Sequence, residues 1–429
     1  MLASLFSVFL VCLFFGVPIM FSMGTSAIVA FLTSSKLPLT IIPSRLFGGL
    51  DSFPLMAVPY FILAGKFMEE GGVSQRLVNF SHALVGFLKG GLGMVAVVAS
   101  MIFAGISGSA AADTSAIGSI LIPSMVRKGY KKGFVACLIS SAGTIGPVIP
   151  PSLMMIIYSS ITGLSVATLF LGGFLPGIIM GICLMVLCYL YALKFPTGQE
   201  ERQRLSLKEI TRTLKEAWIA LIMPVVIIGG IVLGVFTPTE AGAIAVVIAF
   251  FVGTFIYKEI DLKKCWQILI HSAKTSAVVL LIVGMATLFG WILAVNKFPQ
   301  LAINLLLVIS HNPTVIMLLI IGFLLIVGCF VETVAALIIF TPFLYPICTQ
   351  FGYDPIHFAL VVIMTLLIGQ VTPPLGILLF LSSAMTQVKV KESLKFIGPF
   401  IIMLTVAVLC VAFVPGFVLL IPRLVLGYQ

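Results

Sequence analysis

A glycine- and serine-rich stretch, Gly105–Asp113, precedes a proline-rich loop, Gly146–Pro151. Both lie in apolar sequence long enough to cross a bilayer, where an unpaired backbone polar group is strongly unfavourable. A helix break at that depth is tolerated only where protein or a water-filled cavity receives the freed N–H and C=O groups. Such breaks commonly hold the ion and substrate sites of transporters. The two stretches therefore predict a transport site within the membrane.

The prolines of these loops determine which backbone oxygens become available. A proline frees the carbonyl four residues earlier, so Pro147, Pro150–Pro151 and their later counterparts Pro373–Pro374 each expose oxygens. Carbonyls and hydroxyls suit Na⁺, whereas a divalent ion would require more carboxylates. We predict two Na⁺ sites with the candidate ligands Ser107, Gly108, Ser109, Thr144, Gly146, Gly328, Glu332, Thr333, Gly369, Val371 and Thr372. The alternative is that small residues only allow close helix packing.

Helices that begin after each break direct the positive ends of their dipoles toward the middle of the membrane. We expect an anionic substrate group there, with the candidate contacts Ser109, Asp113, Thr144, Pro150, Thr333 and Thr372. Asp113 could instead cap the first of these helices. Glu332 is an intramembrane carboxylate and therefore a functional candidate. It could bind the ion, carry a proton or pair with Lys274 or Lys297, and the sequence does not choose among these roles.

The second half of the chain repeats the first at an offset of 223 residues without a gap. The paired landmarks are Gly105 and Gly328, Pro123 and Pro346, Gly129–Tyr130 and Gly352–Tyr353, Gly146 and Gly369, Pro150–Pro151 and Pro373–Pro374, Ser159–Ser160 and Ser382–Ser383, and Pro176 and Pro399. General apolar similarity would not hold Pro, Gly and Tyr in one register. The pattern therefore predicts an internal structural repeat.

Composition restricts the class of protein. Of the 429 residues, 61% are hydrophobic and 9% are charged, whereas a soluble domain carries about 25% charged residues. The chain is therefore an integral membrane protein. Its net charge of +10 comes from short loops between spans, where the positive-inside rule places Lys and Arg, and it does not indicate nucleic-acid binding. The eight cysteines form no CxxC pair and no Walker motif is present, so pumping must use an ion gradient or ATP bound by another chain.

The expected fold is an all-α polytopic membrane protein with an inverted repeat, two re-entrant helical hairpins and two proline-broken spans. Leu92–Val126 is too short for two crossings and predicts a hairpin with Gly105–Ala111 at its tip; one kinked helix or two tilted short helices is the alternative. We expect a polar connection over Lys36–Asp51 and a span over Thr275–Val295 after a short amphipathic piece. The expected domains are 1–90, with scaffold helices and an interfacial arm, and 194–311, with a cytoplasmic linker, scaffold helices and an interfacial arm. The linker is the charged connection between the repeats, Lys194–Lys215. The segments 91–193 and 312–429 are expected to hold the two transport halves, each with one hairpin.

Charge predicts the orientation of the repeats. The turn Arg127–Lys132 holds four basic residues, whereas its counterpart Gln350–Pro355 holds none. Short basic loops remain cytoplasmic, so the first hairpin should open to the cytoplasm and the second to the outside. Both termini then lie outside. The number of spans agrees with this orientation, because an odd number of crossings places the two hairpins on opposite sides of the membrane. The five spans expected between the hairpins are 131–163, 166–193, 218–236, 241–257 and 275–295.

The motifs Gly105–Gly118, Gly143–Ser152 and Gly369–Gly376 resemble the large membrane subunit of the tripartite ATP-independent periplasmic (TRAP) transporters over essentially the whole chain. The resemblance implies a bacterial inner-membrane protein that works by an elevator mechanism with Na⁺ coupling and without ATP. It implies two partners, a small four-helix membrane subunit on a separate polypeptide and a periplasmic substrate-binding protein. It also implies a carboxylate substrate, such as sialic acid or a C4-dicarboxylate.

Other functions remain open at this point. A stand-alone Na⁺/dicarboxylate or citrate elevator carrier would need no binding protein. A Na⁺/H⁺ antiporter would usually need an intramembrane Asp pair, whereas only Asp113 and Glu332 are found, in different halves. A membrane-embedded enzyme is disfavoured because the chain has no HExxH, Ser/His/Asp or paired-Asp constellation.

Overall fold

The structure, a computed structural model, describes residues 1–33, 38–195 and 206–428, and within these ranges it holds α-helices and short 3₁₀ and π turns but no strand. The first-half helices are α1 (Leu2–Phe14), α2 (Ile19–Thr33), α3 (Ile41–Leu50), α4 (Ala57–Glu70), α5 (Val73–Val85), α6 (Gly91–Ser107), α7 (Ala110–Arg127), α8 (Lys132–Gly143), α9 (Leu153–Thr162) and α10 (Val166–Lys194). The second-half helices are α11 (Leu207–Val232), α12 (Pro238–Phe251), α13 (Leu262–Val295), α14 (Phe298–Ile309), α15 (Pro313–Phe330), α16 (Thr333–Gln350), α17 (Pro355–Gly369), α18 (Ile377–Met385), α19 (Val390–Phe413) and α20 (Gly416–Leu426).

Seven of the helices in the described ranges are long and apolar enough to cross a membrane, and the bent pair of α3 and α4 makes an eighth candidate. The predicted all-α polytopic class is therefore confirmed. Local sequence explains where these helices begin. At α12, for example, Thr237 and Glu240 form a reciprocal capping box and Pro238 occupies the first turn.

The internal repeat appears in the helix bounds. α7 and α16 begin and end at the same offset of 223 residues, and the pairs α8–α9 and α17–α18 are interrupted at corresponding places. α9 packs against α16, and α18 packs against α7. Each broken helix therefore contacts the hairpin of the other repeat, and these contacts place the candidate site residues at the centre of the fold.

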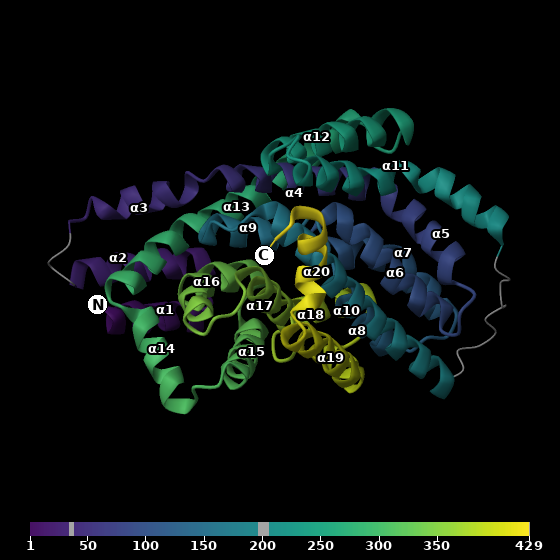
Figure 1. Cartoon of the computed structure of the whole chain (residues 1–429). Helices are drawn as coiled ribbons and strands as arrows, with labels where there is room; N and C mark the ends of the chain where they lie inside the picture. The colour runs from purple at the N-terminus through teal and green to yellow at the C-terminus, as the bar shows by residue number, and fades with distance from the viewer. Residues whose placement is uncertain (34–37, 196–205, 429) are drawn as a thin grey trace.

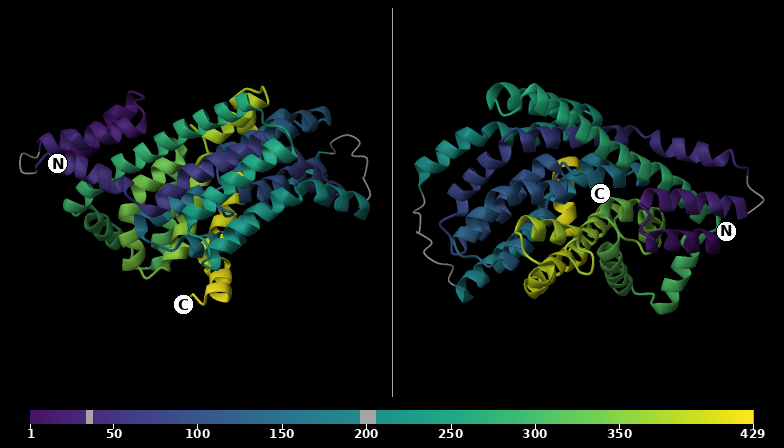
Figure 2. Two further views of the ribbon diagram at one scale, coloured as in Figure 1. Left: turned by 90° about the horizontal axis from the view of Figure 1, so that it is seen from above. Right: turned by 180° about the vertical axis from the view of Figure 1, so that it is seen from behind.

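The remaining helices surround this centre. α4 packs against α12 and α13, and α3 packs along α13. Figure 1 shows α3, α4, α11 and α12 along one edge of the molecule, with α15, α18 and α19 toward the opposite edge. The view from behind in Figure 2 shows the same separation. The C-terminal α20 packs against α10 and α17.

Three predictions about the scaffold changed or were resolved. The interval Lys36–Asp51 was expected as a polar connection, but it contains α3, whose Gly49 lies against the Thr287 side chain of α13. The apolar residues of this interval recur at helical spacing, and that pattern favours a helix more strongly than the few polar residues favour a connection. The amphipathic piece and span expected before Val295 form one 34-residue helix, α13, because no proline interrupts it and Asp261 caps its start. The sequence around Gly16 and Pro18 allows either two short spans or one long broken span, and the structure has two helices, α1 and α2, packed together.

The expected charged connection between the repeats is only partly described. Its residues Glu200, Glu201, Arg202 and Arg204, like Lys36 before α3, lie outside the described residues. The part that follows belongs to α11, which begins at a Ser206 cap and carries Arg212 against Glu209 and Glu216 on an exposed face.

Candidate transport site

The first break is narrower than the sequence predicts. α6 continues to Ser107 and α7 starts at Ala110, so only Gly108 and Ser109 interrupt them rather than the whole of Gly105–Ala111. Gly108 adopts φ +59°, and a Cβ there would lie 2.6 Å from the Pro151 carbonyl oxygen. Glycine is required at this position because it combines a left-handed backbone with a close approach to the proline loop.

Asp113 is fully buried one turn inside α7. The Ser107 hydroxyl donates a hydrogen bond to Asp113 Oδ1, whereas Oδ2 is buried without a protein partner. A Cβ on Gly146 would lie 2.0 Å from that Oδ2, so the carboxylate packs directly against the broken loop. Ser109 is the N-cap residue of α7 and makes no side-chain cap bond. The alternative that Asp113 caps this helix is therefore not what the structure shows.

The carbonyls freed by the prolines mostly accept local hydrogen bonds. The Gly143 oxygen accepts from the Gly146 N–H at 3.2 Å, and the Pro147 oxygen accepts from the Ser152 hydroxyl. In the second repeat the Gly369 oxygen accepts from the Thr372 N–H at 3.0 Å. A carbonyl has two lone pairs, so each retains capacity to bind a cation, but none of these three oxygens is orphaned.

The orphaned oxygens belong instead to side chains. Of the eleven buried side-chain oxygens without a hydrogen-bond partner in the described ranges, five lie at or near the two breaks: Asp113 Oδ2, Thr114 Oγ1, Ser141 Oγ, Thr333 Oγ1 and Gln370 Oε1. The other six lie farther from the breaks, on Ser74, Ser81, Tyr158, Thr254, Ser272 and Thr341. A Cβ placed on Gly143 would lie 2.0 Å from Thr114 Oγ1. The sequence analysis missed Thr114, Ser141, Thr341 and Gln370. The sequence signal for Thr114, Ser141 and Gln370 was present, because each is a polar residue within apolar sequence beside a break. Thr341 lies inside α16, away from the break.

The second break lies at Val331 and Glu332, between α15 and α16. Glu332 occupies the N-cap position of α16, and its Oε2 accepts from the Ala335 N–H at 3.0 Å. Within the described ranges it forms no ion pair with Lys274 or Lys297. The carboxylate therefore lies at the positive end of α16, at the position that Ser109 holds in the first repeat.

In the second repeat, the hairpin and the broken helix meet through backbone atoms. A Cβ on Gly369 would lie 2.3 Å from the Gly328 carbonyl carbon and 2.4 Å from its Cα. α15 and α17 therefore meet backbone to backbone at these two glycines. The structure brings both predicted glycines together here, while Val371 is buried in the loop that follows.

The remaining predicted residues lie at the same breaks but are internally bonded. The Thr144 hydroxyl donates to the Ser141 carbonyl at 2.7 Å, and the Thr372 hydroxyl donates to the Ile368 carbonyl at 2.8 Å. The Ser109 N–H donates to the Ser107 hydroxyl at 3.2 Å. Pro150 is buried next to the hairpin, with its oxygen 3.6 Å from a Cβ placed on Gly105. The structure thus brings together Ser107, Asp113 and Gly146 in the first repeat, and Gly328 and Gly369 in the second.

The atoms of both groups that could bind a cation are oxygens. No cluster of three or more His, Cys, Asp or Glu side chains occurs among the residues that the structure describes. Hydroxyl, amide and carbonyl oxygens with a single carboxylate in each group match the hard, weakly charged ligand sets of monovalent cations better than those of Ca²⁺ or Zn²⁺. The residues present therefore fit Na⁺.

Known proteins resemble the chain over most of its length. A large permease of a sialic acid TRAP transporter from Vibrio cholerae is 39% identical over the whole of both chains. A C4-dicarboxylate TRAP large permease from Pseudomonas aeruginosa is 37% identical over 94% of each chain. An isethionate TRAP permease, DctMQ, from Oleidesulfovibrio alaskensis is 38% identical over 97% of this chain, which spans only 65% of that protein.

A solved structure shares the fold. The YdaH transporter of Alcanivorax borkumensis superimposes with a TM-score of 0.58 over 88% of this chain and 89% of its own, at 15% identity. Its similarity supports the helical architecture alone.

A family profile described as the DctM component of the tripartite ATP-independent periplasmic transporters matches residues 6–417. The matched proteins are transport permeases rather than enzymes. With seven apolar spans among its described residues, the chain is a multi-pass protein of the inner membrane. The family resemblance of the hairpin and loop motifs is thereby confirmed, and the chain belongs to the DctM family of TRAP transporter large permeases.

Proposed function

We propose that this permease couples the inward movement of Na⁺ to the uptake of an organic carboxylate. The observation that carries the proposal is the pair of helix breaks at which buried oxygens, Asp113 Oδ2 and Thr333 Oγ1 among them, have no protein partner. A buried polar oxygen without a partner costs free energy, and a bound cation would supply the missing interaction.

The first Na⁺ would be held by the group around Ser107, Ser109, Asp113 and Gly146, and the second by the group around Glu332, Thr333 and Gly369. The bound ions would supply positive charge that offsets the carboxylate of the substrate. The helix N-termini at Ala110 and Thr333 add partial positive charge on the same side. Together these features favour a substrate with one or more carboxylates.

The proposed movement is of the elevator type. The hairpins and broken helices contact one another across the repeat, through α7–α18 and α9–α16, and would move together. Helices α3, α4, α12 and α13 pack among themselves and would form the stationary scaffold. The first hairpin would open to the cytoplasm and the second to the periplasm, with both termini periplasmic.

We further propose that a periplasmic binding protein delivers the substrate and that a small membrane subunit completes the permease. The relatives named for sialic acid and C4-dicarboxylates support a carboxylate substrate. This chain spans only 65% of the isethionate relative, DctMQ, which supports a further membrane component in a complete permease.

Glu332→Gln is expected to lower Na⁺-dependent uptake roughly tenfold, because it removes a charge of the kind that contributes a few kcal/mol to ion binding. The amide oxygen of Gln can still accept from the Ala335 N–H, so thermal unfolding should change little. Uptake of a labelled carboxylate into proteoliposomes under a Na⁺ gradient provides the measurement.

Asp354→Asn is the matched control, because Asp354 caps α17 in the same way, accepting from the Ile356 and His357 N–H groups at 2.9 Å. It should leave uptake unchanged. Equal Na⁺-coupled uptake by the Glu332→Gln variant and the parent protein would remove Glu332 from the mechanism.

A further inference from the structure

The scaffold helix α4 meets the first hairpin close to the backbone at one glycine. A Cβ on Gly65 would lie 3.3 Å from Ser107 Cα and 3.5 Å from the Ser107 carbonyl oxygen. Ser107 is the residue whose hydroxyl donates to Asp113. Residues four apart share one face of a helix, so Glu69, one turn after Gly65, lies on the face of α4 that meets this hairpin.

The charge of Glu69 acts on the first group of candidate ligands. The Glu69 side chain is only 18% exposed, and its carboxylate is close enough to Asp113 for the two charges to interact. Asp113 is fully buried, and water and salt screen charges less where burial shields them. A negative charge at Glu69 therefore favours a cation at Asp113.

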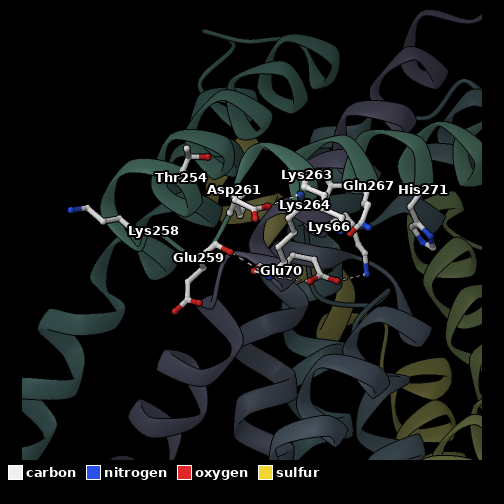
Figure 3. A pocket seen from close by; sticks show the side chains of 12 residues that line it. Lys66, Glu70, Thr254, Lys258, Glu259, Asp261, Lys263, Lys264, Gln267 and His271 are labelled. Atoms are coloured by element: carbon white, nitrogen blue, oxygen red, sulfur yellow. Dashed lines mark hydrogen bonds and ion pairs between the residues drawn. The ribbon is translucent and has the colours of Figure 1, made fainter.

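Lys66 opposes this effect of Glu69. The Lys66 amine lies 3.0 Å from Glu69 Oε2 and 3.2 Å from Glu70 Oε1. Lys66 and Glu70 line a polar cleft of about 860 Å³ where α4 meets the start of α13, and there the Lys264 amine lies 3.3 Å from Glu70. Figure 3 shows Lys66, Glu70 and Lys264 turned toward one another between α4 and α13. Glu70 thus has a second lysine as a partner, and the Lys66 amine partly neutralises the charge that Glu69 presents to Asp113.

We propose that Glu69 and Lys66 are positioning residues that set the Na⁺ affinity of the first group through Asp113, Glu69 by raising it and Lys66 by limiting it. The inference rests on the Na⁺ site proposed at Asp113. Because Glu69 belongs to the scaffold and Asp113 to the hairpin, the proposed elevator movement would change the separation of the two carboxylates. The Na⁺ affinity would then differ between the two positions of the hairpin, which would favour binding on one side of the membrane and release on the other.

The test compares Glu69→Gln with Lys66→Gln in the full-length protein purified in detergent. The measurement is the NaCl concentration that gives half of the Na⁺-dependent rise in unfolding temperature, with KCl added to keep the ionic strength constant. Glu69→Gln should raise this midpoint about threefold to tenfold, and Lys66→Gln should lower it by a similar factor, because partly buried charges act on nearby cations with energies of that order.

Opposite shifts separate this role from a structural one. Both variants lose the same ion pair, so a pair that only stabilised the fold would lower the unfolding temperature in both and leave the Na⁺ midpoint unchanged. Each variant keeps one of the neighbouring ion pairs, Lys66 with Glu70 or Lys264 with Glu70, so we expect both to fold.

Glu209→Gln and Arg212→Gln are the matched controls, because these residues form an ion pair of the same spacing on an exposed face of α11. Both should keep the midpoint of the parent protein. Midpoints that match the parent in both α4 variants, or that move in one direction, would overturn the inference, even where Asp113→Asn abolishes the Na⁺-dependent shift as the proposed function requires. A parent protein with equal unfolding temperatures in NaCl and KCl would overturn the inference together with the proposed Na⁺ site.

Discussion

Replacing Gly369 with alanine is expected to abolish most Na⁺-dependent uptake and to lower the unfolding temperature. The added Cβ would lie 2.3 Å and 2.4 Å from two backbone atoms of Gly328, and backbone cannot rotate away as a flexible side chain can. α15 and α17 would have to separate at the second break. Overpacking of a filled core costs about 1–3 kcal/mol, and here it also displaces the candidate ion ligands. Detergent-solubilised thermal unfolding and proteoliposome uptake measure the two effects.

Gly322→Ala is the matched control for this prediction. Gly322 lies on the same helix, α15, and a Cβ there would meet no atom within 4 Å. The control should unfold and transport like the parent protein. A Gly369→Ala variant that matched this control in both assays would show that the close approach of the two glycines has no functional role.

Asp113→Asn is expected to cause the second large loss of Na⁺ binding and of Na⁺-dependent uptake. The substitution keeps the size of the side chain and its oxygen toward Ser107 but removes the only charge in the first group of candidate ligands. Na⁺ affinity should fall by about tenfold to a hundredfold, because interactions with a charged group contribute roughly 1.5–3 kcal/mol. Since a ligand that binds the folded state raises its stability, the parent should unfold at a higher temperature in NaCl than in KCl, and the variant should lose that difference.

The Na⁺-dependent thermal shift separates ion binding from a general loss of transport. Asp51→Asn serves as the control, because it removes the same charge from an exposed residue. Asp51 lies between α3 and the following 3₁₀ turn. It should retain the full shift. If Asp113→Asn also retained the shift and the parent's uptake, the first group of residues would not be a Na⁺ site.

The helix breaks were predictable because their cause is local. Proline lacks an N–H and glycine permits a left-handed backbone, so Gly108, Pro150–Pro151 and Pro373–Pro374 favour interruptions of the apolar helices. Single prolines are less decisive, since Pro123 and Pro176 lie inside α7 and α10. The repeat was predictable for a similar reason, since landmarks such as Gly146 and Gly369 retain one offset through the sequence. These signals do not depend on which distant residue each break contacts.

The contacts across the breaks were not predictable from spacing. Ser107 and Asp113 are six residues apart, which is not a helical neighbour distance; they meet because Gly108 reverses the chain between them. Gly328 and Gly369 meet because α15 packs against α17. The orphaned oxygen of Thr114 likewise depends on a neighbour from another helix, Gly143.

The scaffold was harder to predict because charge was given too much weight. The interval Lys36–Asp51 was expected as a polar connection, yet α3 forms within it and places Arg45 over the Trp291 ring at 5.4 Å, where a cation is stabilised. The polar first half of α13 suggested a separate amphipathic segment, yet nothing in its sequence ends the helix. In sequence, a polar face on a continuous helix and a polar break between two helices give the same pattern unless Gly or Pro marks the end of the helix.

The central claim is best tested by uptake of labelled sialic acid into proteoliposomes that contain this chain, with and without its small membrane subunit and a substrate-loaded binding protein. The account predicts uptake only when all three proteins and an inward Na⁺ gradient are present, with a panel of C4-dicarboxylates tested the same way if sialic acid is not carried. Na⁺-driven uptake of any of these carboxylates by this chain alone would contradict the three-part account and indicate a stand-alone carrier. Uptake that is unchanged when K⁺ replaces Na⁺ would contradict the proposed coupling.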